Sequence, residues 1–207
     1  MIFIPFFYAA MAITGYSLPQ RVTAPPKGTT IKIMWTEPSK ENGCTRKING
    51  QYISHASDAE KAALGLVSTF VASNCDWHGT SKKDLPIMTC ELSRALGFEL
   101  QCSEGQLQFL QSWFRSDTVT LKKLVPDSCA STPPGAHSQQ SFSSITLRRT
   151  GNTLLVSFVV DGVNLRVMKS WSYRENLYFR LSPQRDQLRV VRTTIKKLNE
   201  KNIDTDE

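Results

Sequence analysis

Hydrophobic and polar residues alternate with a period of two through much of the C-terminal third of the chain. Four segments show this alternation: 145–148, 154–160, 163–171 and 177–181. A period of two is typical of strands with one buried face and one exposed face. Turn-forming residues stand between the segments, namely Gly151-Asn152, Asp161-Gly162 and Arg174-Glu175-Asn176. The pattern predicts an antiparallel meander of at least four strands, packed on one side only.

The segment that follows this meander has two interpretations. Apolar residues recur at helical spacing between Leu188 and Leu198, and Ser182-Pro183 resembles a helix start. However, β-branched residues crowd the same segment, and residues 183–186 have the composition of a four-residue hairpin turn. We favour a fifth strand that ends near Ile195, followed by a frayed polar tail. The choice between strand and helix for residues 183–198 stays open.

Helical periodicity dominates the preceding part of the chain. Ser57 and Glu60 have capping-box spacing, and the apolar positions after them predict a helix that ends near Asn74. A second helix is expected over 84–97, with an aspartate cap, a proline in the first turn and a glycine after the last turn. A third helix begins at Ser103, which also has a capping-box partner three residues further on.

Two short strands are predicted ahead of these helices. Residues 31–35 alternate well enough for a strand, and Asn49-Gly50 is a strong turn signal that would return the chain into a second strand at 51–53. The stretch 131–144 is rich in Ser, Pro and Gln and marks the boundary between the helical and the sheet regions.

These elements predict an α+β fold. We expect an N-terminal, disulfide-containing helical half with about three helices, followed by a C-terminal antiparallel β-meander of four to five strands. The regions would be 1–17 as a signal peptide, 18–135 as the helical, cysteine-containing region, and 136–207 as the sheet region with its acidic tail. With 207 residues the chain is long enough for one compact domain with a sizeable core.

The first fifteen residues are almost wholly apolar, and no charge occurs before Arg21. This run is too short to span a bilayer but has the length of a signal-peptide core, and Gly15 and Ser17 suit a cleavage site. No Lys or Arg precedes the run, so the true start could lie upstream of Met1, and a buried N-terminal element is the alternative. We expect export to the periplasm or to the exterior, with no transmembrane anchor after processing.

Export changes the interpretation of the cysteines. The five are Cys44, Cys75, Cys90, Cys102 and Cys129. No pair has the C-x-x-C spacing of a zinc or redox site, so we expect two disulfides and one unpaired thiol. Fifteen connectivities are possible, and the sequence does not select among them; a link from Cys102 to Cys129 would close a loop of moderate length. In a reducing compartment the same residues would be ordinary buried thiols.

The net charge of +7 is concentrated in the sheet region. Residues 141–197 carry eleven Lys or Arg against three Asp or Glu, which favours an anionic partner. Regular alternation places four side chains on the exposed face, the candidate binding residues Arg148, Arg166, Tyr178 and Arg180. Arginine and tyrosine dominate interaction hot spots. The plainer interpretation is that a positive surface merely keeps the protein soluble.

Catalytic and metal-binding motifs are missing from the sequence. The three histidines share no metal-ligand spacing, and no nucleotide-binding loop, hydrolase elbow or calcium loop occurs. We therefore expect no catalytic residue, no metal and no cofactor, and we favour a non-enzyme. The layout resembles, in architecture only, small exported bacterial proteins such as inhibitors and immunity factors.

Three functional hypotheses remain. The first is an exported, non-enzymatic binding protein (an inhibitor, immunity factor or secretion accessory) that recognises an acidic protein or an anionic envelope component through its basic sheet face. The second is a protein that binds nucleic acid or another polyanion through the same Arg/Tyr face. The third is a hydrolase with carboxylates dispersed along the chain.

Overall fold

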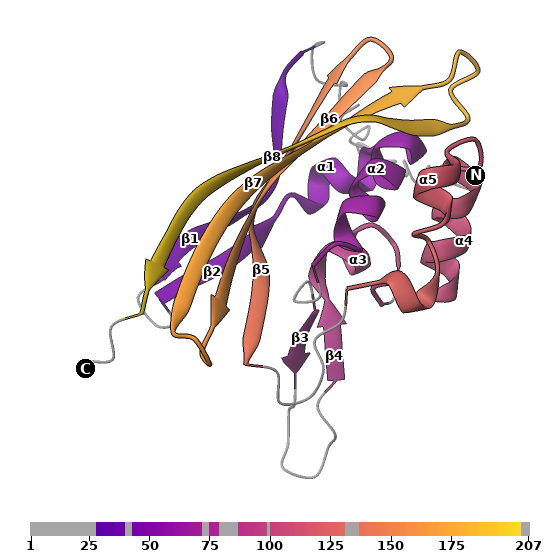
Figure 1. The fold of residues 1–207 in the computed structure, drawn as a ribbon. Helices are drawn as coiled ribbons and strands as arrows, with labels where there is room; N and C mark the ends of the chain where they lie inside the picture. The colour runs from indigo at the N-terminus through magenta and orange to yellow at the C-terminus, as the bar shows by residue number, and fades with distance from the viewer. Residues whose placement is uncertain are drawn as a thin grey trace, which may run out of the picture.

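A six-stranded antiparallel sheet forms one layer of the protein, and helices lie against one of its faces (Figure 1). The computed structural model describes residues 28–39, 43–71, 75–78, 87–98, 100–130 and 137–203. The strands of this sheet are β1 (Thr30–Ser39), β2 (Gly43–Ile48), β5 (Ser138–Thr150), β6 (Thr153–Asn164), β7 (Lys169–Leu181) and β8 (Leu188–Asn202). Their order across the sheet is β2-β1-β5-β6-β7-β8, so β2 and β8 are the edge strands.

The helical layer is formed by short helices that follow one another between β2 and β5. These are α1 (Gly50–His55), α2 (Asp58–Ser68), α3 (Glu91–Ala95), α4 (Glu104–Trp113), α5 (Thr118–Leu121) and the 3₁₀ helix η2 (Pro126–Ser128). A separate two-stranded hairpin, β3 (Cys75–His78) with β4 (Ile87–Cys90), projects beside them (Figure 1).

The core lies between the helices and the sheet face that they cover, which we call the inward face. Every second residue of β6 from Leu154 to Val160 is buried there, as the alternation predicts. Phe158 is at the centre, with its ring 5.6 Å from that of Phe142 and 6.2 Å from that of Phe70, centroid to centroid. The opposite sheet face carries no helix of the described chain, and we call it the outward face.

The predicted fold class is wrong in the way it divides the chain. The mixture of helices and an antiparallel sheet is confirmed, but the N-terminal part is not a helical half, because β1 and β2 belong to the same sheet as the meander. In that pairing Ile31 of β1 lies opposite Leu147 of β5. The sheet has six strands rather than four to five, and the described residues contain five α-helices rather than about three.

The position of the disulfide was also wrongly predicted. Cys102 lies next to the midpoint of the 207-residue chain and Cys129 lies beyond it, so their bond is not in an N-terminal helical half. Its existence confirms one of the pairings that the sequence allows. Cys75 stands opposite Cys90 in the β3–β4 register. The side chains of both, like that of Cys44, lie outside the described part of the structure, so their pairing stays a prediction.

Two of the predicted turns are wrong, because Asp161-Gly162 and Arg174-Glu175-Asn176 lie inside β6 and β7. Gly162 has another reason to be glycine: a Cβ there would be 2.3 Å from the Trp171 indole, which lies directly over it. The actual turn comes after Asn164, whose side-chain oxygen accepts from the amide of Arg166 at 3.0 Å. The predicted turns at Gly151-Asn152 and at residues 183–186 are confirmed.

The Asn49-Gly50 signal predicted a hairpin and instead starts a helix. The Asn49 side chain accepts from the Tyr52 amide at 3.0 Å and so caps α1, and the expected returning strand at 51–53 is helical. Asparagine is favoured both in tight turns and at helix N-caps, since in both it replaces a missing backbone partner. The local sequence is therefore compatible with either a hairpin turn or a helix N-cap at this position.

The capping predictions hold better than the predicted helix lengths. The capping box at Ser57 is present, but α2 ends at Ser68, where the hydroxyls of Ser68 and Thr69 donate to carbonyls three residues back. Ser103 caps α4 as expected. The second helix is confined to Glu91–Ala95, because residues 87–90 form β4. Its predicted cap, Asp84, lies outside the described residues.

The ambiguous C-terminal segment is a strand, as favoured from its β-branched residues. It continues to Asn202, so the predicted end near Ile195 and the frayed tail from Asn199 are wrong. Two extra residues in β8, Val191 and Leu198, interrupt its register with β7. Such bulges leave the ladder intact on either side while shifting the phase of the side chains.

Asp117 joins the helical layer to the edge of the sheet. Its carboxylate accepts from the Thr120 amide at 3.1 Å, which caps α5, and from the Val190 amide of β8 at 2.9 Å. Burial by itself would raise the pKa of the Asp117 carboxyl. The hydrogen bonds from Val190 and Thr120, together with the charge of Arg189, outweigh burial and hold that pKa below its usual 3.8.

We expect Asp117→Ala to lower the free energy of unfolding by about 2 kcal/mol at neutral pH, because a helix cap and a buried acceptor are lost together. A lowered folded-state pKa means that the ionised carboxylate stabilises the protein above pH 3.8 and that this contribution disappears as the pH falls through the lowered value. Urea unfolding at neutral and at acid pH measures both effects. The exposed Asp127→Ala variant is the control, and equal losses in the two variants would contradict this role.

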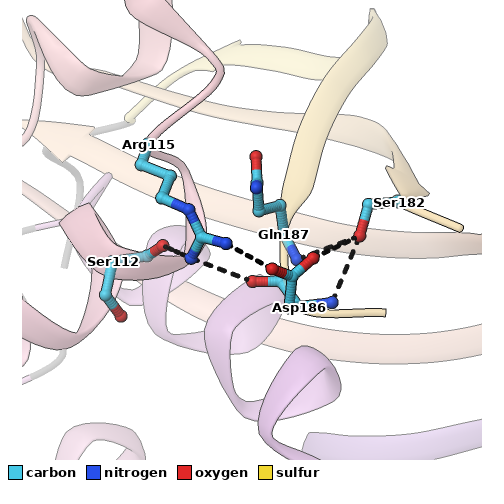
Figure 2. Close-up of polar contacts among 5 residues, drawn as sticks. All are labelled: Ser112, Arg115, Ser182, Asp186 and Gln187. Atoms are coloured by element: carbon cyan, nitrogen blue, oxygen red, sulfur yellow. Dashed lines mark hydrogen bonds and ion pairs between the residues drawn. The ribbon is translucent and has the colours of Figure 1, made fainter. Parts of the chain in front are cut away.

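A second contact fixes the loop between β7 and β8 onto the end of α4 (Figure 2). The Arg115 guanidinium pairs with the Asp186 carboxylate and also donates to the Ser112 carbonyl at 3.1 Å. The Ser182 hydroxyl donates to Asp186 at 2.8 Å, and these two partners lower the pKa of the Asp186 carboxyl. Both charged groups are half-exposed, so the pair positions the start of β8 more than it stabilises the fold.

Candidate functional site

The outward face of β5–β8 concentrates positive charge. Before the bulge at Leu198 the register places six exposed Lys or Arg side chains on it, and Lys201 follows beyond that bulge. The six are Arg148, Arg174, Arg180, Arg189, Arg192 and Lys196. Asp161 is the one acidic residue of the described parts of these strands that shares the face. We call this set, together with Tyr178, the basic face.

Three of the four predicted binding residues lie together on this face. Leu155 of β6 is flanked by Arg148 on one side and by Tyr178 on the other, and Arg180 follows two residues further along β7. Arg166 does not belong to the face, because β6 ends at Asn164 and Arg166 lies in the loop that leads to β7. Arg166 was expected on the exposed face because a turn was wrongly predicted at Asp161-Gly162, which would have placed Arg166 in the next strand.

Four members of the basic face were missed from the sequence, for three reasons. Arg174 was assigned to a turn, although it is a strand residue paired with Val159. The sequence leaves residues 183–198 open between strand and helix, so it assigns no face to Arg189. The bulge at Val191 then moves Arg192 and Lys196 onto the same face as Arg189. A bulge has no simple sequence signal, so regular alternation gives the wrong phase beyond it.

Tyr178 and Arg192 form the most ordered contact of the basic face. The Arg192 guanidinium carbon is 4.3 Å from the centre of the Tyr178 ring, and one guanidinium nitrogen donates to the Tyr178 hydroxyl at 3.1 Å. A cation stacked in this way is held in place and keeps its remaining N–H donors free to bind a carboxylate. The pair therefore presents a fixed positive group at the surface.

An apolar strip runs through the middle of the face. Leu155, Val159 and Val163 of β6 point outward and are half-buried, with Ser157 and Asp161 between them along the strand. Arg148 of β5 lies beside Leu155, and Arg174 of β7 lies beside Val159. In the described part of the structure, no carboxylate forms an ion pair with Arg148, Arg174 or Arg180. An apolar centre with a charged rim is the usual anatomy of a protein-binding surface.

Two further features of the described residues concern metal binding and membrane insertion. They contain no group of three or more His, Cys, Asp and Glu side chains arranged to hold a metal ion. Among the helices of the same residues, none is long and apolar enough to cross a membrane. The predicted signal peptide, residues 1–17, lies outside the described part of the chain.

Comparison with protein-family models, with curated proteins and with solved structures gives no match. Function is therefore inferred from the residues of this chain alone.

Proposed function

We propose that this protein is an exported, non-enzymatic binding protein that recognises an acidic protein through the basic face. The observation that carries the proposal is the outward arrangement of Arg148, Arg174 and Arg180 beside an apolar strip, with none of the three ion-paired to a carboxylate in the described structure. Unpaired, exposed arginines form bidentate hydrogen bonds with carboxylates at little desolvation cost. An inhibitor, immunity factor or secretion accessory would use such a surface.

The disulfide supports the exported location. Disulfides such as Cys102–Cys129 form and persist mainly in oxidising compartments, and the apolar N-terminal run has the composition of a signal peptide. The proposal places the mature protein in the periplasm or outside the cell.

An acidic protein suits the basic face better than a nucleic acid does. Proteins that bind single-stranded nucleic acid offer free aromatic rings on which bases stack. Tyr178 is the one aromatic residue among the members of the basic face, and one side of its ring is already covered by Arg192. The apolar strip at Leu155 and Val159 also offers nothing to a phosphate backbone, whereas it suits a partner with apolar residues among its acids.

The partner class is tested by capture on the immobilised protein, with and without nuclease treatment of the extract. We expect an acidic protein to be retained in both samples and to be released as the salt concentration rises, because exposed charge pairs are screened. Loss of the captured material after nuclease treatment would show that nucleic acid is the ligand and would contradict the proposal.

A further inference from the structure

β8 is an unusually long edge strand. It has 15 residues, against 6 in β2 at the opposite edge, and it pairs with β7 along one side. No described strand pairs with its outer side. A row of unpaired amides and carbonyls at a sheet edge can bind an added strand.

The direction of these amides follows from one hydrogen bond. The Val190 amide donates to Asp117 and so points away from β7. Val190 pairs with Phe179, and the alternate residues of β7, Leu177, Glu175 and Tyr173, pair with Thr193, Ile195 and Lys197. In an antiparallel ladder alternate pairs have the same hydrogen-bonding type, so the amides of residues 193, 195 and 197 also point to the outer side.

Charge decides which kind of strand fits this edge. β8 carries five basic residues and one acidic residue. The basic residues are Arg189, Arg192, Lys196, Lys197 and Lys201, and the acidic residue is Glu200. A second copy of β8 laid alongside would bring like charges together, and the bulges and lysines are devices that oppose such self-pairing. An acidic strand is complementary to it. Asp117 already shows a carboxylate accepting from an amide of this edge.

The inward side of the same edge offers an apolar contact beyond the helices. A groove of about 390 Å³ is lined there by Val167, Trp171, Tyr173 and Ile195. Lys169 and Lys197 lie beside them, both ion-paired to Glu200 of the same groove. Ile195 is 67 % exposed, although its register partner Glu175 is half-buried. An added strand alternates its side chains, so apolar residues would lie over Ile195 while acidic residues face Arg192 and Lys196.

We propose that residues 193–202 of β8 accept an extended, acidic segment of the partner as a seventh strand. That the partner is acidic rests on the proposed function; what is added here is that the partner pairs with β8 as a strand. Main-chain hydrogen bonds would supply binding energy, the groove would take an apolar side chain, and the neighbouring basic face would bind the rest of the partner's surface.

Amide hydrogen exchange, followed residue by residue by NMR, tests this mode. The probe is a ten-residue capped peptide of alternating glutamate and valine, and the control is the matching lysine–valine peptide. We expect the acidic peptide to slow the exchange of the amides of residues 193, 195 and 197 by about tenfold or more. Binding without slower exchange at these amides, or no binding of the acidic peptide, would overturn the inference.

A substitution separates main-chain pairing from side-chain contact. Ile195→Pro removes an amide that points away from β7, so it leaves the β7–β8 ladder intact, whereas Ile195→Val keeps both the amide and the apolar surface. We expect only the proline variant to stop binding the acidic peptide, while circular dichroism shows that both variants are folded. If substitutions in the basic face weaken binding of the natural partner but the partner does not slow exchange of the β8 amides, this inference fails and the proposed function stands. If those substitutions leave binding unchanged and the β8 amides also exchange at the same rate, both are rejected.

Discussion

Replacing Arg148 and Arg180 together by glutamate is expected to weaken binding of the acidic partner by about a hundredfold or more. Each arginine of a binding hot spot contributes about 1.5 kcal/mol or more, and about 1.4 kcal/mol corresponds to a tenfold change in affinity. Reversal of the charge adds repulsion to the loss of the hydrogen bonds. Titration calorimetry with the captured partner measures the change.

The melting temperature of this double variant should stay nearly unchanged. Both side chains are exposed, and neither forms an ion pair in the described structure. The matched control is Arg166→Glu with Arg185→Glu, which alters the net charge equally but in the two loops that flank β7. We expect the control to keep most of the affinity. Equal losses in the two double variants would mean that only the total charge matters, and the basic face would then not be the binding surface.

Replacing Cys102 and Cys129 together by serine is expected to lower the free energy of unfolding by about 3 to 4 kcal/mol. The bond spans a sequence separation of 27 residues, so its removal restores much conformational freedom to the unfolded chain. The closed segment contains α4 and α5, including Phe114, whose ring is 6.0 Å from that of Phe179 in the core. Urea unfolding under non-reducing conditions measures the loss.

Reduction of the unaltered protein is the control for this prediction. If the disulfide is the cause, the reduced protein and the double serine variant should have similar urea midpoints, and added reductant should change the variant much less. A variant as stable as the parent would contradict the assigned role. A count of free thiols in the native protein would at the same time show whether two of Cys44, Cys75 and Cys90 form the second disulfide and leave one free thiol, as the sequence leads us to expect.

Local signals in the sequence predicted the long strands and the capped helices α2 and α4, but they missed the shorter elements β2, β3, β4, α1 and α5 and misplaced some turns. The alternation in β6 identified its buried face residue by residue, and the caps at Ser57 and Ser103 were correct because capping depends on a few neighbouring residues. Gly162 was taken for a turn because glycine has two uses. Only the folded chain shows that Trp171 needs the space above it.

Non-local pairing explains the larger error in the fold. The helix-rich part of the chain separates β1 from β5, and nothing near Ile31 indicates that it will lie opposite Leu147. The same limit applies to the basic face. Arg148, Tyr178 and Arg180 could be predicted from alternation, whereas Arg192 could not, because the bulge at Val191 reverses the phase of β8.

Arginine footprinting of the complex tests the binding surface most directly. Phenylglyoxal modifies accessible arginines, and mass spectrometry reads every site in one experiment. We predict that the partner protects Arg148, Arg174 and Arg180 while Arg166 and Arg185 in the loops stay reactive. Protection confined to Arg94 and Arg115 on the helical side, with the outward arginines still reactive, would contradict the account.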